Sequence, residues 1–310
     1  MWKHGKTPQG KVRWYCKNCK TTGIRKRGDV RSRRATRLVY EWVLEGKKLK
    51  HLAKQEHLTI WHVQKLIHDA LPRIILPKRI RTLDPERPLI LDAVWIVKRS
   101  IATLIAHDGV HVIDWMFVSR ENTETWLGIL RGLKGTPLGA VSDAQKGLLS
   151  AVSLRFGVIP HQRCIIHVAR QARTWLTQHP KYAAGVELLH LVSELGHVKT
   201  TEDAVSWNAE LDLLFESHHD FLKERSHSPE GKWWYTHRKL RGVRSLLLNA
   251  RSNLFTYLST PLPRTSNHLE GGINGPLKAF LKEHRGLRPE QKMRVTDIFL
   301  SARARRKNQH

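Results

Sequence analysis

The chain has 310 residues, in which 54 lysines and arginines outnumber 27 aspartates and glutamates, for a formal net charge of +27. Hydrophobic residues make up 40% of it, so we expect folded domains rather than a disordered basic tail. A folded chain this basic is expected to meet a polyanion, and nucleic acid is the first candidate. No apolar run is long enough to span a membrane, and three cysteines cannot build a disulfide framework. We therefore expect a cytoplasmic protein without a membrane partner.

Residues 1–29 are basic and contain Cys16 and Cys19 in a Cys-x-x-Cys spacing. Two cysteines at this spacing can clamp Zn²⁺ through a tight turn, although a structural zinc site needs four ligands. The segment resembles the second half of a zinc ribbon, whose first half would precede Met1. The alternative is a flexible basic arm.

In residues 30–80, apolar residues recur at helical intervals in three short segments, which predicts three helices. The first helix would end before Gly46, and the second would cover about 49–55. Thr59 is a plausible N-cap for the third helix, which Pro72 stops. This pattern favours a helix-turn-helix over a bundle that packs only against its own chain. The residues that we expect to contact DNA are Arg31, Arg33, Arg34 and Arg37 before the first helix, and Trp61, His62, Gln64 and Lys65 on the third.

Residues 81–174 begin with a buried strand, 89–98, that contains Asp92. A carboxylate in a buried strand is costly unless it is paired, hydrogen-bonded or bound to a metal. Asp108-Gly109 marks a hairpin between the next two strands, and Asp143 ends a later short strand. The resulting order, β-β-β-α-β-α-β, is that of a ribonuclease-H-like sheet, in which the first and fourth strands are neighbours. Asp92 and Asp143 would then converge, with Asp114 as a weaker rival.

Two converging carboxylates either share a proton or bind divalent metal. Mg²⁺, or Mn²⁺ in its place, suits a site with so few soft ligands, and two such ions suit in-line phosphoryl transfer. Cys164 and His167 could also bind metal, but two ligands do not make a zinc site. From the residues alone, a buried cysteine and a core histidine at a strand end are favoured.

Residues 175–262 read as a helical insertion rich in aromatic residues, which are expected mostly in its core. A long basic helix over 235–257 would bring Arg241 and Arg244 to DNA.

Residues 263–310 would form a helix of the catalytic domain, capped by Ser266 or Asn267, with Glu270 in its first turns. A basic tail with Arg303, Arg305, Arg306 and Lys307 follows.

Four short motifs carry a resemblance to a known family. They are Leu91-Asp92-Ala93, Ser142-Asp143-Ala144 with Lys146-Gly147, Cys164-x-x-His167, and Thr265-Ser266-Asn267-x-Leu269-Glu270. With them the chain resembles prokaryotic insertion-sequence transposases of the DDE class, in the Mutator-like superfamily. The resemblance implies an α/β catalytic domain with a ribonuclease-H-like mixed sheet, whose first part covers residues 81–174. An all-helical insertion would interrupt this domain. A partial zinc ribbon and a helix-turn-helix would precede it. The chain departs from the family in lacking the ribbon's first Cys-x-x-Cys.

The resemblance also implies site residues and partners. Asp92, Asp143 and Glu270 would be the metal-binding catalytic acids, and Cys164 and His167 would have a structural or substrate-positioning role. The partners would be double-stranded DNA, as transposon ends and target, and further copies of the chain in a synaptic dimer or larger assembly at the nucleoid. The alternatives are a ribonuclease-H-like nuclease or resolvase without strand transfer, and a non-catalytic helix-turn-helix protein derived from a decayed transposase.

Overall fold

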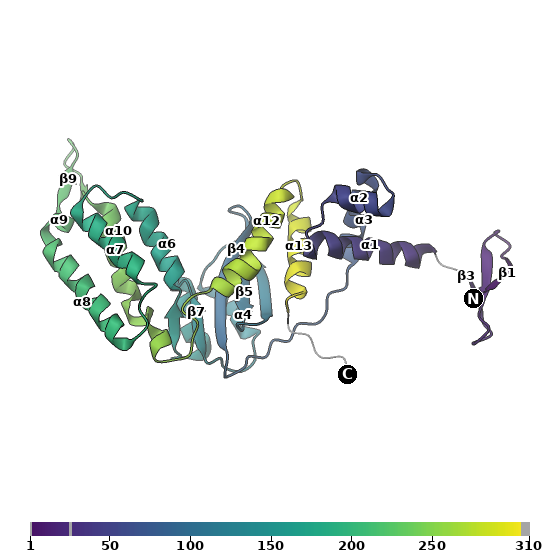
Figure 1. Ribbon diagram of the computed structural model, residues 1–310, viewed down its shortest axis with the longest axis horizontal. Coiled ribbons are helices and arrows are strands. Elements are labelled where there is room, and N and C mark those ends of the chain that lie inside the picture. The colour runs from purple at the N-terminus through teal and green to yellow at the C-terminus, as the bar shows by residue number, and fades with distance from the viewer. Residues whose placement is uncertain (1, 25–26, 305–310) are drawn as a thin grey trace. The chain divides into compact units, whose positions relative to one another are not determined.

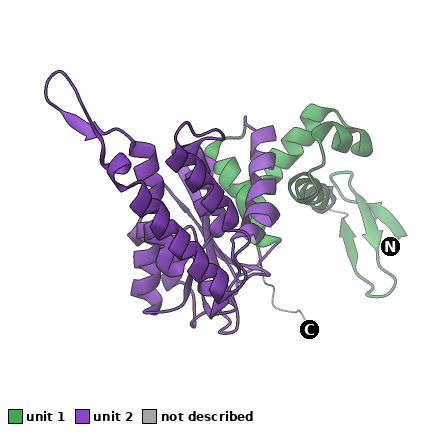
Figure 2. Ribbon diagram, turned by 60° about the vertical axis from the view of Figure 1, so that its left-hand side comes forward, with its two compact units in different colours: residues 1–76, 287–302 green, residues 77–286, 303–310 purple. Residues whose placement is uncertain are grey.

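The computed structural model describes residues 2–24 and 27–304, apart from the side chains of residues 27–31 and 268. The chain forms two compact units, shown in Figure 2. Unit 1 comprises Met1–Leu76 and Leu287–Ala302, and unit 2 comprises Pro77–Gly286 and Arg303–His310.

Unit 1 begins with a small antiparallel sheet in the order β1-β2-β3. Its strands are β1 (Trp2–Lys6), β2 (Val12–Tyr15) and β3 (Thr22–Ile24). Cys16 and Cys19 lie in the turn between β2 and β3, which a hydrogen bond from the Cys16 amide to the Thr21 carbonyl closes at 3.0 Å. The predicted tight turn around the cysteine pair is therefore present.

The three helices expected in residues 30–80 are present as α1 (Arg27–Leu44), α2 (Leu49–Glu56) and α3 (Ile60–Ala70), followed by a 3-10 turn, η1 (Leu71–Arg73). Thr59 caps α3 as predicted, because its hydroxyl accepts a hydrogen bond from the His62 amide. Helix α1 begins earlier than expected, so the arginines before Leu38 are helical.

The C-terminal part of the chain holds two helices where one was expected. Helix α13 (Pro289–Ser301) belongs to unit 1 and packs beside α1 and η1. Arg294 ties it to η1 by donating to the Leu71 carbonyl at 2.9 Å and to the Ile74 carbonyl. The sequence prediction, which placed this segment with the catalytic domain, did not anticipate this packing.

Unit 2 contains a five-stranded mixed sheet in the order β6-β5-β4-β7-β8. Strands β4, β5 and β7 of this sheet are labelled in Figure 1. Strands β4 to β6 are antiparallel, and β4, β7 and β8 are parallel. The strands are β4 (Pro88–Val97), β5 (Ile101–His107), β6 (Val112–Val118), β7 (Gly139–Ser142) and β8 (His161–Arg163). The predicted strand order is confirmed, including the pairing of the first strand with the fourth.

Helices α4 (Thr123–Arg131) and α5 (Lys146–Phe156) pack on one face of this sheet. Leu89 and Leu91 of β4 lie in this core, so the alternation of a strand turns Asp92 to the opposite face. Gly147 allows α5 to approach the start of α4, since an added Cβ would lie 3.0 Å from the Thr123 nitrogen.

A bundle of helices with its own core follows the sheet (Figure 1). Its elements are α6 (Ile165–Leu176), α7 (Ala183–Glu194), α8 (Thr201–Ser217), α9 (His219–Lys223) and α10 (Arg238–Ala250). Most of the aromatic side chains expected in a core do pack there, including Trp207. Every helix in the described part of the chain is too short or too polar to cross a membrane.

Two sequence expectations for this segment were wrong. It is not all-helical, because β9 (Arg225–His227) and β10 (Trp233–Tyr235) form an antiparallel hairpin. The expected helix over 235–257 covers only α10, and the 3-10 turns η2 (Arg251–Asn253) and η3 (Thr256–Leu258) follow it. The run Trp-Trp-Tyr favours a strand, and the turn at Gly231, with a φ of +79°, closes the hairpin.

The chain returns to the sheet as α11 (Asn267–Leu269), a π-helix η4 (Glu270–Asn274) and α12 (Gly275–Glu283). Leu277, Phe280 and Leu281 are buried, as predicted for the apolar face of this helix. The π-helical turn carries Glu270 at one end and Asn274 at the other. π-Helical turns often occur at functional sites.

Candidate active site

Asp92 lies in the middle of β4, where one carboxylate oxygen accepts a hydrogen bond from the side-chain amide of Asn274 at 2.7 Å. The other oxygen accepts from the Ala93 backbone amide at 2.9 Å. Asn274 is 2% exposed, and its own carbonyl oxygen is buried without a hydrogen-bond partner among the described residues. The Asp92 side chain is therefore held in one direction by groups that water cannot easily replace.

Asp143 directly follows β7, and the sheet register brings it beside Asp92. Strand β4 pairs with β7 through Leu89 with Ala140 and Ile90 with Val141, so two further residues along each strand lead to the two aspartates. The predicted approach of Asp92 and Asp143 therefore agrees with the register. The charge of Asp143 also contributes to the raised pKa of Asp92.

The loop that carries Asp143 is fixed by a short chain of hydrogen bonds. Ala144 has a φ of +58°, a left-handed conformation that is strained for a residue with a side chain. The Ser142 hydroxyl accepts from the Ala144 amide at 2.9 Å and contacts the His161 Nε2 at 2.8 Å. His161 on β8 thus supports the turn on which Asp143 sits.

His161 should make the stability of the protein depend on pH. Burial lowers its pKa from 6.5 to about 4, so between these values the unfolded chain binds more protons than the folded one. The free energy of unfolding should therefore fall by about 2–3 kcal/mol from pH 7 to pH 4.5 through this residue alone. Urea unfolding of wild type and His161→Gln at both pH values measures it. An equal loss of stability in both proteins would contradict the assignment.

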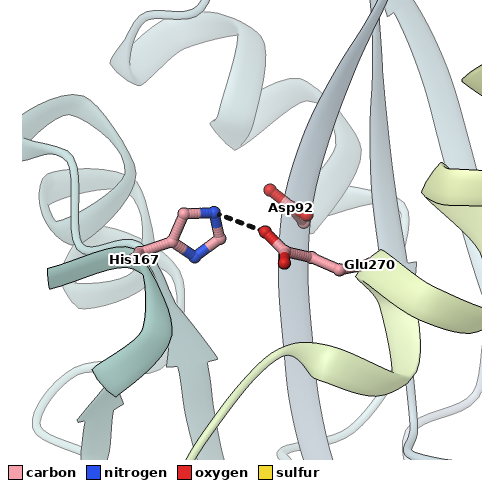
Figure 3. A group of neighbouring side chains, drawn as sticks. All are labelled: Asp92, His167 and Glu270. Atoms are coloured by element: carbon pink, nitrogen blue, oxygen red, sulfur yellow. Dashed lines mark ion pairs between the residues drawn. The ribbon is translucent and has the colours of Figure 1, made fainter. Parts of the chain in front are cut away.

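Glu270 of η4 is held by two cations from α6. Arg170 forms a two-pronged ion pair with it, at 3.0 and 2.9 Å, and the His167 Nε2 lies 3.0 Å from the carboxylate. The hydrogen bonds from Arg170 lower the pKa of Glu270, and the His167 charge acts in the same direction. Figure 3 shows His167 and Glu270 facing each other in front of Asp92.

His167 is also linked to Cys164 and Ser266, two buried residues from separate parts of the chain. The Ser266 amide and hydroxyl each donate to the Cys164 sulfur at 3.3 Å. A hydrogen bond to Cys164 raises the pKa of His167 to about 9, and the carboxylates of Asp92 and Glu270 reinforce this. His167 is therefore a cation at neutral pH, and Cys164 joins the start of α6 to the segment that carries Glu270.

The carboxylates affect one another electrostatically. Burial raises the pKa of Asp92 to about 6, and the charges of Asp143 and Glu270 act in the same direction. Burial also raises the pKa of Glu121, with further contributions from Asp143 and Asp92. Glu121 is thus a fourth carboxylate close enough to be affected by this site.

The donor set fits a hard divalent cation. Ligand atoms of Asp92, His167 and Glu270 lie within 4.8 Å of one another, a group of three found within residues 2–24 and 27–304. Asp143 is not a member of this group. Carboxylate oxygens are the ligands that Mg²⁺ prefers, and a protonated His167 cannot donate a lone pair. Without a bound metal, the raised pKa of His167 makes it a counter-ion of the neighbouring carboxylates.

Two other aspartates have structural roles. Asp108 accepts hydrogen bonds from the Val110 and His111 amides, as expected for its hairpin turn. Asp114, the weaker rival for the site, pairs with Arg79 at 2.7 Å and Arg81 at 2.8 Å.

The described residues include no group of three metal-binding side chains around Cys16 and Cys19. The Cys19 thiol lies 2.9 Å from the Thr21 hydroxyl, and this hydrogen bond lowers the pKa of Cys19 to about 7. A lowered thiol pKa favours the thiolate that zinc requires. Zinc binding stays a prediction.

The residues expected to contact DNA fall into different environments. Trp61, His62, Gln64 and Lys65 are exposed on α3, opposite its buried face. Arg34 and Arg37 instead pair with Glu56 of α2, and Arg37 also pairs with Glu41 at 2.7 Å. Arg33 is exposed.

The remaining basic residues that were expected to contact DNA also differ in their surroundings. Arg241 lies 3.5 Å from the Tyr235 ring centroid, and Arg244 lies 5.3 Å from that of Phe215. Arg303 is partly buried, and burial lowers its pKa. The Arg31 side chain and the tail residues Arg305, Arg306 and Lys307 lie outside the described residues.

Three side chains in or near the site, Arg170, Asn274 and Glu121, were not among the residues predicted from the sequence. Two of them could have been found from helical spacing. Arg170 is three residues after His167, and Asn274 is four residues after Glu270, so each pair shares one face of a helix. Glu121 had no such signal, because it lies just before the N-cap of α4.

Fold and site together define an α/β protein with acidic residues gathered at a mixed sheet. Residues 92–205 match the family described as Transposase, Mutator family. Over 80 residues the chain is 41% identical to the transposases for insertion sequence element IS256 in transposon Tn4001 of Staphylococcus aureus and of Enterococcus faecalis. That segment makes up 24% of this chain and 20% of each relative. The predicted resemblance to insertion-sequence transposases of the Mutator-like superfamily is thereby confirmed.

Proposed function

We propose that the chain is a DNA transposase of an insertion sequence, which binds transposon ends and catalyses metal-dependent strand cleavage and strand transfer. The observation that carries the proposal is the meeting of Asp92 and Glu270, with Asp143 in register beside Asp92. The segment matching Mutator-family transposases begins at Asp92 and includes Asp143 and His167. The strand order β6-β5-β4-β7-β8 supports a ribonuclease-H-like catalytic domain.

In this proposal, Asp92, Asp143 and Glu270 hold Mg²⁺ or Mn²⁺ as a DDE triad. Two such ions would supply activation of the attacking hydroxyl and stabilisation of the leaving oxygen. The same site would serve cleavage by water and joining by the freed 3′-hydroxyl, since both are phosphoryl transfers.

The surrounding side chains would act as positioning residues. Asn274 fixes the direction of Asp92, while Arg170 and His167 balance the charge of Glu270. The Arg170 side chain is 59% exposed, so its guanidinium can also meet a DNA phosphate that approaches the carboxylates. Cys164 keeps His167 protonated and attached to the segment that carries Glu270.

We further propose that α1–α3 form a helix-turn-helix that recognises double-stranded transposon ends, with α3 in the major groove. Support comes from the exposed polar face of α3 opposite its buried Val63 and Ile67. Pairing of two ends would require a dimer or larger assembly. The Cys16 and Cys19 pair would contribute half of a zinc site in this end-binding part.

Gln64→Ala and Lys65→Ala should weaken end binding in different ways. A glutamine can read an adenine edge, so Gln64→Ala should cost about 1–3 kcal/mol on the true end and little on a scrambled duplex. A lysine facing phosphate contributes equally to both duplexes, and its loss should lower the salt slope by about 0.9. Anisotropy titrations with both duplexes at several salt concentrations distinguish the two roles. An equal loss on both duplexes for Gln64→Ala would contradict base reading by that residue.

The proposed function is tested by incubating the protein with a labelled duplex from the gene's own flanks, in Mg²⁺ and in Mn²⁺. Metal-dependent nicking at the end, together with joined product, is expected. Nicking without joining would favour a nuclease or resolvase. Specific binding to the end duplex without nicking or joining would indicate a non-catalytic DNA-binding protein.

A further inference from the structure

The hairpin β9–β10 is a separate feature that neither the sheet nor the bundle core requires. It projects beyond the helices of its own unit in both views (Figures 1 and 2). Trp233 pairs with His227 and Tyr235 pairs with Arg225, so these four side chains share one face, and Trp234 lies on the other. Trp233 is 50% exposed and Trp234 is 42% exposed. Large aromatic side chains are thus kept in contact with solvent.

The base of the hairpin is firmly attached to the bundle. The buried ring of His237 stacks on Phe221 with 3.8 Å between ring centroids and lies 2.9 Å from the Glu224 carboxylate. The Thr236 amide donates to the Glu224 carbonyl at 3.0 Å. The exposed tryptophans are therefore presented on a fixed element.

Cations alternate with aromatic rings along one face of the hairpin. Arg241 lies 3.5 Å from the Tyr235 centroid, and Arg225 lies 5.9 Å from Tyr235 and 4.3 Å from Trp233. Arginine planes and aromatic rings are both surfaces on which nucleobases stack. The outermost ring, Trp233, can accept a further planar group.

A basic cavity of about 260 Å³ lies at the base of the hairpin. Its lining includes Lys223, Arg225, Arg241 and Arg244, and no carboxylate side chain. None of these four cations forms an ion pair with a carboxylate within the described chain. A concave surface with this charge and without internal counter-ions suits phosphate groups.

We propose that the hairpin and this basic cavity form a binding site for an unpaired DNA strand. A base stacks on Trp233, which shares its face with Arg225 and Tyr235, and the neighbouring phosphates enter the cavity that these two residues line. A continuous duplex fits poorly, because its bases already cover each other's faces and leave none for an indole ring. The proposal rests on the proposed function only for the source of the strand, which would be DNA opened at a transposon end. The binding itself needs neither metal nor cleavage.

The experiment compares two oligonucleotides in metal-free buffer, an oligothymidylate of about 12 nucleotides and an abasic strand of the same length. Both carry the same phosphates, so the ratio of their affinities for the full-length protein reports base stacking alone. Wild type should prefer the oligothymidylate, and the variant Trp233→Ala should bind it about 5- to 100-fold more weakly. Its affinity for the abasic strand should not change.

Trp61→Ala is the matched control, because Trp61 is also exposed but lies on α3. It should reduce duplex-end binding and leave the preference for bases intact. Arg244→Gln should lower the salt slope by about 0.7 on the oligothymidylate and the abasic strand alike.

Equal affinity of wild type for the oligothymidylate and the abasic strand, or an unchanged preference in Trp233→Ala, would overturn the proposal. Preference for bases in a protein that neither cleaves nor joins DNA would overturn the proposed function and leave this site standing.

Discussion

Replacing Asp92 by asparagine is expected to slow metal-dependent strand cleavage at least about 1,000-fold, because it removes a charged ligand from the centre of the site. Asp143→Asn and Glu270→Gln should cause losses of the same order. Single-turnover rates on a labelled end duplex in Mg²⁺ measure the effect. End binding in metal-free buffer should be unchanged, which separates a loss of chemistry from a loss of recognition.

The same substitution should not destabilise the metal-free protein. Burial raises the pKa of Asp92 to about 6, so above that pH the ionised carboxylate costs folding free energy. A neutral asparagine avoids this cost at pH 7 and should leave the melting temperature equal or higher. A clear drop in melting temperature for Asp92→Asn would indicate a structural role for this carboxylate instead.

Asp114→Asn provides the control within the same sheet. The Asp114 side chain is 4% exposed and pairs with Arg79 and Arg81, so the substitution removes the carboxylate charge that both cations contact. We expect about 2 kcal/mol of destabilisation, less than for a fully buried pair because the arginines are partly exposed. The cleavage rate per folded molecule should stay close to that of wild type. Asp92→Asn would thus slow cleavage without lowering stability, whereas Asp114→Asn would lower stability without slowing cleavage.

Local patterns were sufficient to predict much of the sheet and the strands that carry Asp92 and Asp143. The buried run around Asp92 and the Asp108-Gly109 turn indicate consecutive antiparallel strands, and the short strand before Asp143 can be placed by strand order. These signals depend on alternation and turn chemistry, which are encoded within a few residues. The close approach of Asp92 and Asp143 follows from pairing register once the strand order is known.

The environment of Glu270 could not be predicted in the same way. Its partners Arg170 and His167 lie about a hundred residues earlier, on a helix whose docking depends on the whole bundle. The packing of helix α13 beside α1 and η1 was not predicted for a similar reason, since its apolar positions do not say which core they join. The hairpin at Trp233 was missed because a short aromatic run fits a strand or a helix equally well without its neighbours.

Asn274→Leu should raise the metal concentration needed for half-maximal cleavage about 10- to 100-fold. Leucine has a similar volume but cannot donate to Asp92, so the carboxylate would lose the 2.7 Å hydrogen bond that sets its direction. The π-helical turn would still place Glu270, and its contacts with Arg170 and His167 do not involve Asn274. The readout is a titration of cleavage rate against Mg²⁺. Excess metal should restore most of the rate, because the ligands themselves are intact.

Asn253→Leu is the matched control for this substitution, since the Asn253 side-chain carbonyl is also buried without a hydrogen-bond partner within the described residues. It lies in η2 of the helical bundle, outside the acidic cluster, and should leave the metal requirement unchanged. A merely structural role for Asn274 would lower the melting temperature and the rate at every metal concentration. Rescue by metal at an unchanged melting temperature would instead identify Asn274 as the residue that orients Asp92. Failure of high Mg²⁺ to restore the rate would remove it from that role.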